Sequence, residues 1–205
     1  MLKALSLEQF SDAVASEEAV PGGGSVSALA GGLAAALAAM VARLTMNKKK
    51  FSEVAAQMET LAHNAIELQR QLMTAVDRDA DSYRQVLAAL RLPKTTDEEK
   101  QARSRAMEAA FRLAADVPLE VAGLSYKIME LAEQGVRLGN PDMITDAGVA
   151  LVLARSAALG ALMNVNINLT YIKDQDVVAD MGATAERIKK AVLQNELAVL
   201  SELPL

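Results

Sequence analysis

The stretch from Phe51 to Leu90, FSEVAAQMETLAHNAIELQRQLMTAVDRDADSYRQVLAAL, decides the fold. Its apolar side chains recur at intervals of three and four residues for roughly ten turns, which places them along one face of a long helix. Nowhere does the chain show the strict alternation of apolar and polar residues between hairpin turns that is typical of strands. The sequence therefore predicts an all-α protein.

Turn and capping signals on both sides of this stretch define the other helices. Ser6, followed three residues later by Gln9, forms a capping box, and the run GNPD at residues 139–142 stops one helix and starts the next. Pro118 is expected to kink the fourth helix, because proline lacks a backbone donor. The predicted helices cover about residues 6–17, 25–45, 51–92, 96–138, 141–171 and 173–200. We expect one domain, residues 1–205, folded as a bundle of about six helices.

Composition and charge exclude several classes of function. With 21 basic and 26 acidic residues, a net charge of −5 and 3% aromatic residues, the chain lacks the basic stripe and stacking rings of a nucleic-acid binder. The absence of cysteine excludes disulfides and thiolate metal sites, and His63 alone makes a catalytic zinc or a Ser-His-Asp triad hard to build. Chemistry must therefore come from carboxylates, lysines, amides and the backbone, and nucleic acid is not an expected partner.

Residues 19–42 form an uncharged segment that is long enough to span a bilayer. Most of it is Ala, Gly and Ser, which contribute little to insertion, so we expect a closely packed helix of a soluble protein and no membrane association. The first residues, MLKALSLE, lack the apolar core of a secretory signal. A cytoplasmic location is the resulting expectation.

One position on the apolar seam of the long helix is an aspartate, Asp79. A buried carboxylate carries a desolvation cost of several kcal/mol unless it is paired. Asp79 is therefore either part of a structural ion pair or hydrogen bond between helices, or a functional group that faces a cavity with a shifted pKa. Asp77 and Asp81 lie on other faces, where we expect solvent, although Asp81 can also flank the same pocket.

Two short runs bracket the second helix. Residues 21–25, PGGGS, expose backbone donors at the positive end of the helix dipole, where an anion or a planar polar ring can bind. The run lacks the lysine ending of a P-loop and follows no strand, so phosphate-loop and Rossmann readings both fail. Residues 47–50, NKKK, close the helix and either complement its C-terminal carbonyls or capture an anionic substrate tail.

Polar residues also interrupt the very apolar fifth helix, which we expect to be the central helix of the bundle. Asn164 and Asn168 are four residues apart on one face, so they either present amides to a ligand or tie down a neighbouring helix. Asp146 lies in the first turns, where the helix dipole favours its anionic form. Arg155 and Asn166 likewise need partners if they are buried.

The ordered set of these motifs resembles the formiminotransferase-cyclodeaminase family, in particular its stand-alone cyclodeaminases and methenyltetrahydrofolate cyclohydrolases. The matching stretches are PGGGS at 21–25, NKKKF at 47–51, Asp79 with DSY at 81–83, LPKT at 92–95, ADVPL at 115–119, GN at 139–140, TDAGVA at 145–150 and NVNINL at 164–169. Val20 and Phe51 depart from the family, where threonine and tyrosine are common, so hydroxyl contacts at those positions are not expected.

The resemblance implies an all-helical homodimer that binds a reduced folate and needs no metal or redox cofactor. The family either removes ammonia from 5-formiminotetrahydrofolate to give 5,10-methenyltetrahydrofolate, or hydrolyses the methenyl bridge to give 10-formyltetrahydrofolate. Both reactions pass through a tetrahedral carbon between N5 and N10. Both activities remain open for this chain, which lacks the transferase half of the animal fusion enzyme.

The same resemblance suggests roles for individual residues. Asp79 and Asp146 are expected to line one pocket and supply acid-base and electrostatic catalysis, and Lys50 to protonate the departing amine or to orient water. Lys48 and Lys49 are expected to attract the glutamate tail of the folate. The turn at residues 22–25 and Asn140 are expected to hydrogen-bond the pterin edge together. The folate-binding residues expected in all are Gly22, Gly23, Gly24, Ser25, Lys48, Lys49, Tyr83, Asn140 and Asn164.

A competing hypothesis is a non-catalytic helical scaffold or regulator whose buried acids are only structural. Under either hypothesis, the second helix is expected to form a close helix–helix contact. Its small residues, spaced three or four apart, let another helix approach closely. We expect this face to pack across the two-fold axis of a homodimer or against the core helix. Its residues are Ser25, Ala28, Gly32, Ala35, Ala36 and Ala39.

Overall fold

The computed structural model describes residues 1–203, and within them the chain forms α-helices and short 3-10 helices but no strand. The predicted all-α class and the six helices are confirmed. The α-helices are α1 (Leu7–Val14), α2 (Gly23–Met46), α3 (Ala55–Leu90), α4 (Asp97–Leu138), α5 (Ile144–Leu169) and α6 (Gln175–Leu200). The 3-10 helices are η1 (Leu2–Ala4), η2 (Lys49–Phe51) and η3 (Pro141–Met143).

Side-chain caps mark the starts of α1, α4 and α6. Ser6 and Gln9 form the predicted capping box of α1, and Thr96 with Glu99 forms a second one at the start of α4. α3 starts later than predicted, at Ala55, because the chain first turns through η2. α2 starts two residues earlier than predicted, at Gly23.

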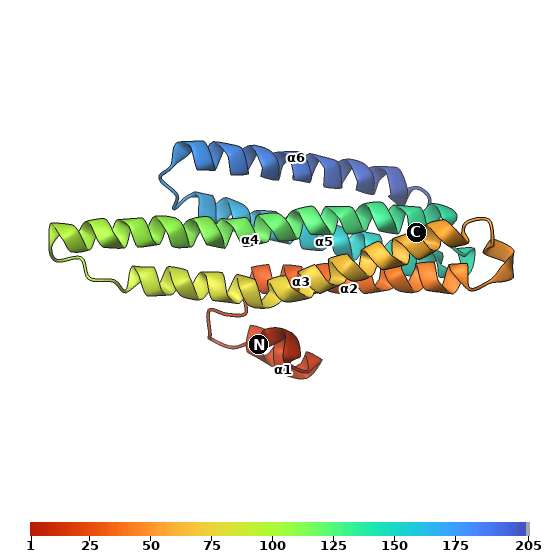
Figure 1. Cartoon of the computed structure of the whole chain (residues 1–205), viewed down its shortest axis with the longest axis horizontal. Helices are drawn as coiled ribbons and strands as arrows, with labels where there is room; N and C mark the ends of the chain where they lie inside the picture. Colours follow the sequence, from red (N-terminus) through yellow and green to blue (C-terminus); the bar gives the residue numbers. More distant parts are fainter. Residues whose placement is uncertain (204–205) are drawn as a thin grey trace.

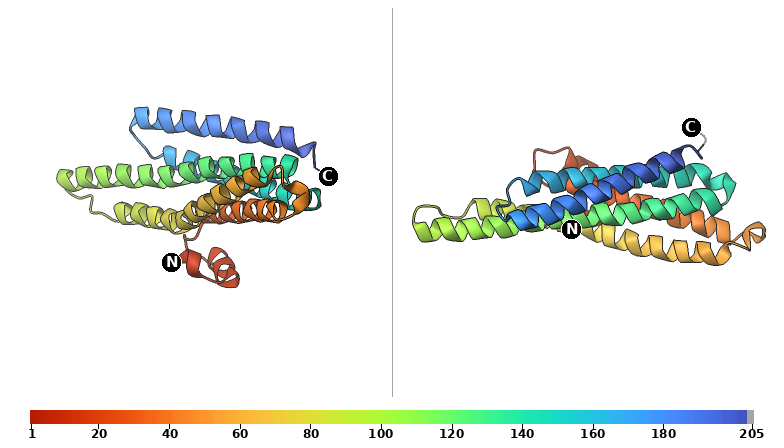
Figure 2. Two further views of the ribbon diagram at one scale, coloured as in Figure 1. Left: turned by 45° about the vertical axis from the view of Figure 1, so that its right-hand side comes forward. Right: turned by 90° about the horizontal axis from the view of Figure 1, so that it is seen from above.

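The long helices lie side by side as an elongated bundle (Figure 1). α2 packs against α3 and α5, α4 packs along α3 and α5, and α6 covers α4 and α5 from one side (Figures 1 and 2). The short α1 lies on the opposite side of the bundle from α6 (Figure 1). The paired ends of α3 and α4 extend past the start of α2 (Figure 1).

The small-residue face of α2 lies inside the chain. Ala28, Ala35 and Ala39 are buried, and a Cβ at Gly32 would lie 3.0 Å from the Met73 sulfur. A Cβ at the neighbouring Gly31 would lie 2.8 Å from Ser125 Oγ. Of the two expected locations for this face, the core of the chain is therefore the one observed, and the expectation of a dimer axis along it is wrong.

Two helical segments, Gly23–Met46 and Pro141–Leu169, are long and apolar enough to cross a membrane by length and composition alone. In the bundle, 61% and 50% of their most apolar stretches are buried. Packing in the core therefore accounts for a large part of their composition. The expectation of no membrane association stays a prediction.

α4 continues through Pro118 as one helix, and a side chain from α5 replaces the hydrogen bond that the proline removes. Pro118 has no N–H to offer the carbonyl of Ala114, four residues earlier. The Asn168 side-chain amide donates to that carbonyl at 2.8 Å. Of the two roles expected for Asn168, the structure therefore shows the second, a hydrogen bond that links α5 to α4.

This replacement predicts a specific coupling between positions 118 and 168. Asn168→Ala should lower the free energy of unfolding by about 1–3 kcal/mol, because it leaves a buried carbonyl without a donor. In the Pro118→Ala background the loss should be smaller, since the alanine N–H can bind the same carbonyl. Urea denaturation of the two single variants and the double variant measures the coupling, and strictly additive losses would contradict this role of Asn168.

Candidate active site

The Asp79 carboxylate on α3 lies directly against the first turn of α2. The Ser25 hydroxyl is 2.8 Å from Asp79 Oδ2 and 3.1 Å from the Val76 carbonyl oxygen, so it can donate to either. A Cβ at Gly24 would lie 2.6 Å from Asp79 Cγ and would overlap the carboxylate. The glycine run is therefore required here because it lets the backbone of α2 approach Asp79 closely.

Burial raises the pKa of Asp79 above its ordinary value, and the hydrogen bonds from the Ser25 hydroxyl and backbone N–H offset this only in part. No lysine or arginine within residues 1–203 lies within 4 Å of this carboxylate. Asp79 is thus held by a hydrogen bond between helices and not by an ion pair. A carboxylate without a resident cation can accept a cationic ligand.

Two further predicted residues lie near this carboxylate. The Asn164 side chain from α5 lies beside Gly23, with its Nδ2 atom 3.4 Å from the position of a Cβ there. Tyr83 follows Asp79 by one turn on α3 and is 38% exposed. We call the group formed by Gly22, Gly23, Gly24, Ser25, Asp79, Tyr83 and Asn164 the carboxylate end.

The remaining predicted residues gather at the other end of α2. The Lys48 ammonium is 3.4 Å from Asp142, and the Lys50 ammonium lies 5.5 Å from the centre of the Phe51 ring. Asn140 is buried, donates its backbone N–H to Thr45 at 2.9 Å, and has no partner for its side-chain Nδ2. We call the group formed by Lys48, Lys49, Lys50, Asn140 and Asp146 the lysine end.

The two ends lie far apart within one chain. α2 has 24 residues and is therefore about 35 Å long. On α5, Asp146 and Asn164 are about 27 Å apart along the helix axis. The expectation that Asp79 and Asp146 line one pocket is therefore wrong for a single chain, as is the expectation that Asn140 joins the glycine run. The cause is that α2 and α5 run antiparallel over their whole length.

Other polar residues that the sequence singled out have structural partners. Arg155 pairs with Glu196 of α6 at 2.9 Å, which explains a charge on the apolar fifth helix. Asp81 is exposed and pairs with Arg84, whereas Asp77 accepts the backbone N–H of Leu2 and so holds the N-terminal segment. The remaining two, His63 and Asn166, are exposed.

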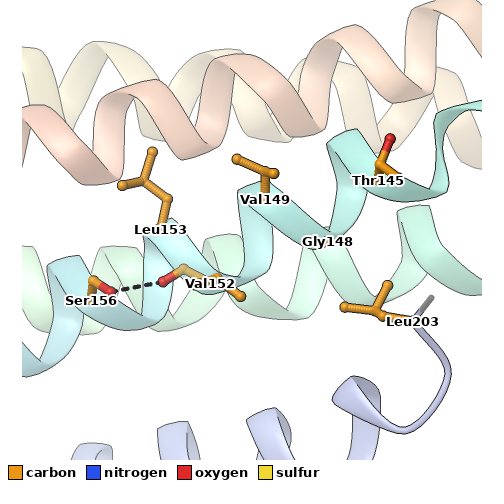
Figure 3. A pocket seen from close by; sticks show the side chains of 7 residues that line it. All are labelled: Thr145, Gly148, Val149, Val152, Leu153, Ser156 and Leu203. Carbon is orange, nitrogen blue, oxygen red and sulfur yellow. Dashed lines mark hydrogen bonds between the residues drawn. The ribbon is translucent and has the colours of Figure 1, made fainter. Parts of the chain in front are cut away.

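An exposed apolar face on α2 and α5 escaped the sequence analysis. Large apolar side chains, each at least 36% exposed, run along both helices: Val26, Leu33, Met40 and Leu44 on α2, and Val149, Val152, Met163 and Ile167 on α5. We call this set the α2–α5 face. Two of these side chains, Val149 and Val152, line an apolar hollow of about 420 Å³ together with Leu153 and Leu203 (Figure 3). α5 packs against α2, α4 and α6, as expected of the central helix, but part of its apolar surface stays exposed in one chain.

The described residues 1–203 contain no group of three histidine, aspartate or glutamate side chains placed to hold a metal ion. What the carboxylate end offers is a set of backbone donors, three side chains with an amide or hydroxyl group and one acid, carried by an all-helical bundle.

Comparison with known proteins assigns this arrangement to a family. The family model described as formiminotransferase-cyclodeaminase matches residues 6–187. A methenyltetrahydrofolate cyclohydrolase from Methylorubrum extorquens is 35% identical, over 91% of this chain and 95% of that protein. A formimidoyltransferase-cyclodeaminase from Rattus norvegicus is 34% identical, over 82% of this chain and 31% of that protein. The chain therefore belongs to the formiminotransferase-cyclodeaminase family.

A solved structure agrees with this assignment. The crystal structure of formiminotetrahydrofolate cyclodeaminase from Thermotoga maritima matches with a TM-score of 0.89 and 28% identity, over 99% of this chain and 98% of that one. The family resemblance inferred from the sequence motifs is confirmed.

The raised pKa of Asp79 predicts how stability changes with pH. As the pH rises from the ordinary carboxyl pKa to the raised pKa of folded Asp79, the unfolded chain loses this proton first, so the free energy of unfolding falls; above that window the loss is complete. Asp79→Asn removes this contribution and should therefore gain stability relative to the unmodified protein across the window. Urea denaturation between pH 4 and 8 measures the difference, with the exposed Asp81→Asn as control. A difference that stays constant with pH would contradict the shifted pKa.

Proposed function

We propose that this protein is a folate enzyme that acts at the N5–N10 bridge. Its reaction is hydrolysis of 5,10-methenyltetrahydrofolate to 10-formyltetrahydrofolate, cyclodeamination of 5-formiminotetrahydrofolate to 5,10-methenyltetrahydrofolate, or both. The names of the bacterial relatives support both reactions. The observation that carries the proposal is Asp79 itself, a partly buried acid without a cationic partner that is fixed against a helix N-terminus.

The geometry fits the charge of the substrate. Methenyltetrahydrofolate carries a delocalised amidinium cation, and Asp79 can face this cation as an anion with little competing water. In hydrolysis, water attacks the bridge carbon, Asp79 takes its proton, and N5 leaves with a proton as the formyl group stays on N10. In cyclodeamination, N10 attacks the formimino carbon, and protonated Asp79 can give its proton to the departing ammonia.

The other residues of the carboxylate end suit the binding of the pterin. The backbone N–H groups of residues 22–24 lie at the start of α2, where the helix dipole adds to their donor strength. Asn164, beside Gly23, and the half-exposed Tyr83, one turn after Asp79, supply further polar groups. No step in this scheme uses a metal or a redox cofactor, and we expect full activity without either, in a cytoplasmic enzyme.

We further propose that the protein works as a homodimer through the α2–α5 face. This face is about 35 Å long and about 20 Å wide, which gives ~700 Å² for each copy, close to the ~800 Å² of a standard interface. Burial of eight large apolar side chains provides the driving force for association.

A two-fold axis that lies in the interface, crosses the middle of this face and runs at right angles to the helices exchanges the two ends of the face. The lysine end of one copy then lies over the carboxylate end of the other, so that Asp79 from one copy and Lys50 from the other share a site. This arrangement would unite the predicted catalytic residues that one chain keeps apart. Asp146 and Asn140 of the second copy would lie in the same shared site, because they belong to the lysine end together with Lys50.

Substitution of Asp79 tests the catalytic role. Asp79→Asn keeps an oxygen acceptor for Ser25, and it should lower the rate by a factor of about 100 or more, because it removes the acid-base group. The loss of methenyltetrahydrofolate absorbance with time measures hydrolysis, and formiminotetrahydrofolate tests the second reaction. Asp81→Asn, two residues away and exposed, is the matched control. Full rates with both substrates in a folded Asp79→Asn protein would reject the assignment, and no folate affinity at all would favour the scaffold hypothesis.

Complementation tests the shared site. Asp79→Asn and Lys50→Ala proteins, each inactive alone, should recover about a quarter of the unmodified rate after they are unfolded, mixed and refolded together, because half of the dimers are mixed and each mixed dimer has one intact site. Sedimentation should report a dimer that Leu33→Glu converts to a monomer. Activity of the mixture no higher than that of the separate variants contradicts the shared site.

A further inference from the structure

The Ser25 side chain lies inside the bundle, with 0% of its surface exposed, and it faces two acceptors on α3. Its hydroxyl oxygen is 2.8 Å from Asp79 Oδ2 and 3.1 Å from the Val76 carbonyl oxygen. A hydroxyl has one proton to donate, so it can bond to only one of the two acceptors at a time. Asp79 itself is half-buried, which leaves part of it open to a substrate.

The protonation state of Asp79 decides between the two acceptors. An ionised carboxylate accepts a stronger hydrogen bond than a backbone carbonyl does, so Ser25 donates to Asp79 Oδ2 while Asp79 is charged. A protonated Asp79 has a proton of its own, which it can donate to the Ser25 oxygen while the Ser25 proton turns to the Val76 carbonyl. All three groups are thus satisfied in both states, and only one hydroxyl group rotates.

The Val76 carbonyl can accept this second bond without loss to α3. A carbonyl oxygen has two lone pairs, and the helix uses one of them for the N–H four residues later, at Ala80. Val76 and Ala80 are both 0% exposed, as is Ser25, so water does not compete for these positions. Asp79 therefore keeps the same place against α2 whether or not it carries a proton.

Within residues 1–203, no side chain other than Ser25 forms a hydrogen bond or an ion pair with the Asp79 carboxylate. α2 carries no ionisable residue before Arg43, and α5 carries none after Arg155. In the proposed dimer, Lys50 and Asp146 of the second copy would also face Asp79. The other ionisable residues around it lie on α3 (Asp77, Arg78, Asp81, Tyr83), on α4 (Asp116, Glu120), in η1 (Lys3) and before α2 (Glu17, Glu18). Ser25 is therefore the side chain of the same copy that acts directly on Asp79.

We propose that Ser25 is a positioning residue whose hydroxyl turns from Asp79 to the Val76 carbonyl when the carboxyl gains a proton, and that its bond to the ionised form favours hydrolysis over cyclodeamination. This inference rests on the proposed function, in which hydrolysis starts from ionised Asp79 and cyclodeamination from protonated Asp79. Burial raises the pKa of Asp79 and the Ser25 hydrogen bond opposes that change, which agrees with the assignment. Ser25 acts through Asp79, since its buried side chain does not reach a substrate.

Rate–pH profiles of the Ser25→Ala protein test the proposal. Loss of the bond to ionised Asp79 should move two limbs to higher pH by about one unit: the acidic limb of hydrolysis, and the alkaline limb of ammonia release from formiminotetrahydrofolate. The ratio of cyclodeamination to hydrolysis should then rise about tenfold at every pH, because it follows the ratio of protonated to ionised Asp79. This ratio cancels any general loss of activity in the variant.

Two further variants make the test specific. Ser27→Ala is the matched control: Ser27 is buried in the same helix but donates to the Gly23 carbonyl at 2.7 Å, and its loss should move neither limb. Ser25→Cys carries a thiol, which is a weaker donor of similar size, so it should give a smaller shift in the same direction. The cysteine variant carries the test if the alanine variant does not fold.

The outcomes separate this proposal from the proposed function. If the unmodified protein reacts with neither substrate, or if Asp79→Asn keeps full rates, the function itself is rejected. If the protein is active but Ser25→Ala leaves the limbs in place, or slows both reactions equally at all pH values, Ser25 is only structural and this proposal alone is overturned. An equal shift in Ser27→Ala also overturns it. Where the protein catalyses one of the two reactions, the limb of that reaction decides.

Discussion

The close approach of the Asp79 carboxylate to the backbone at Gly24 is the constraint on which the functional end of the molecule depends. The same contact desolvates the acid, points it at the start of α2 and leaves room for a single side-chain partner, the Ser25 hydroxyl. Any side chain at position 24 would push α3 away from α2 or rotate the carboxylate out. Orientation and the raised pKa of Asp79 thus share one geometric cause.

Local signals in the sequence were enough to predict the helices. The cap at Ser6, the break at residues 139–142 and the three- and four-residue spacing along α3 each act over a few residues, and local energetics decide them. Asp79 stood out for the same reason, since a polar residue on an apolar seam is visible in the pattern. The role of Asn168 was left open, because its partner Ala114 lies 54 residues away and is an ordinary alanine whose carbonyl is freed by Pro118.

The sequence could not predict which of the site residues lie together in the fold, and the reason is a different one. Periodicity tells which face of a helix is apolar, but it does not tell which end of one helix meets which end of another. The antiparallel course of α2 and α5 sends Asn140 and Asp146 to the far end of the bundle from Asp79. For α5, apolar residues on all sides pointed to burial, yet Met163 and Ile167 remain exposed in one chain. Composition cannot distinguish burial within a chain from burial between chains.

α2 is fixed at both of its ends, and this restricts how its length can change. At its start Gly24 and Ser25 meet Asp79, and at its end the Thr45 hydroxyl accepts the buried backbone N–H of Asn140. One inserted residue would advance the helix by about 1.5 Å and rotate everything after it by about 100°. If the start of α2 kept its contact with Asp79, a different side chain would then face Asn140. If the end kept its contact with Asn140, a different residue would face Asp79. α2 therefore works as a spacer of set length between Asp79 and Asn140.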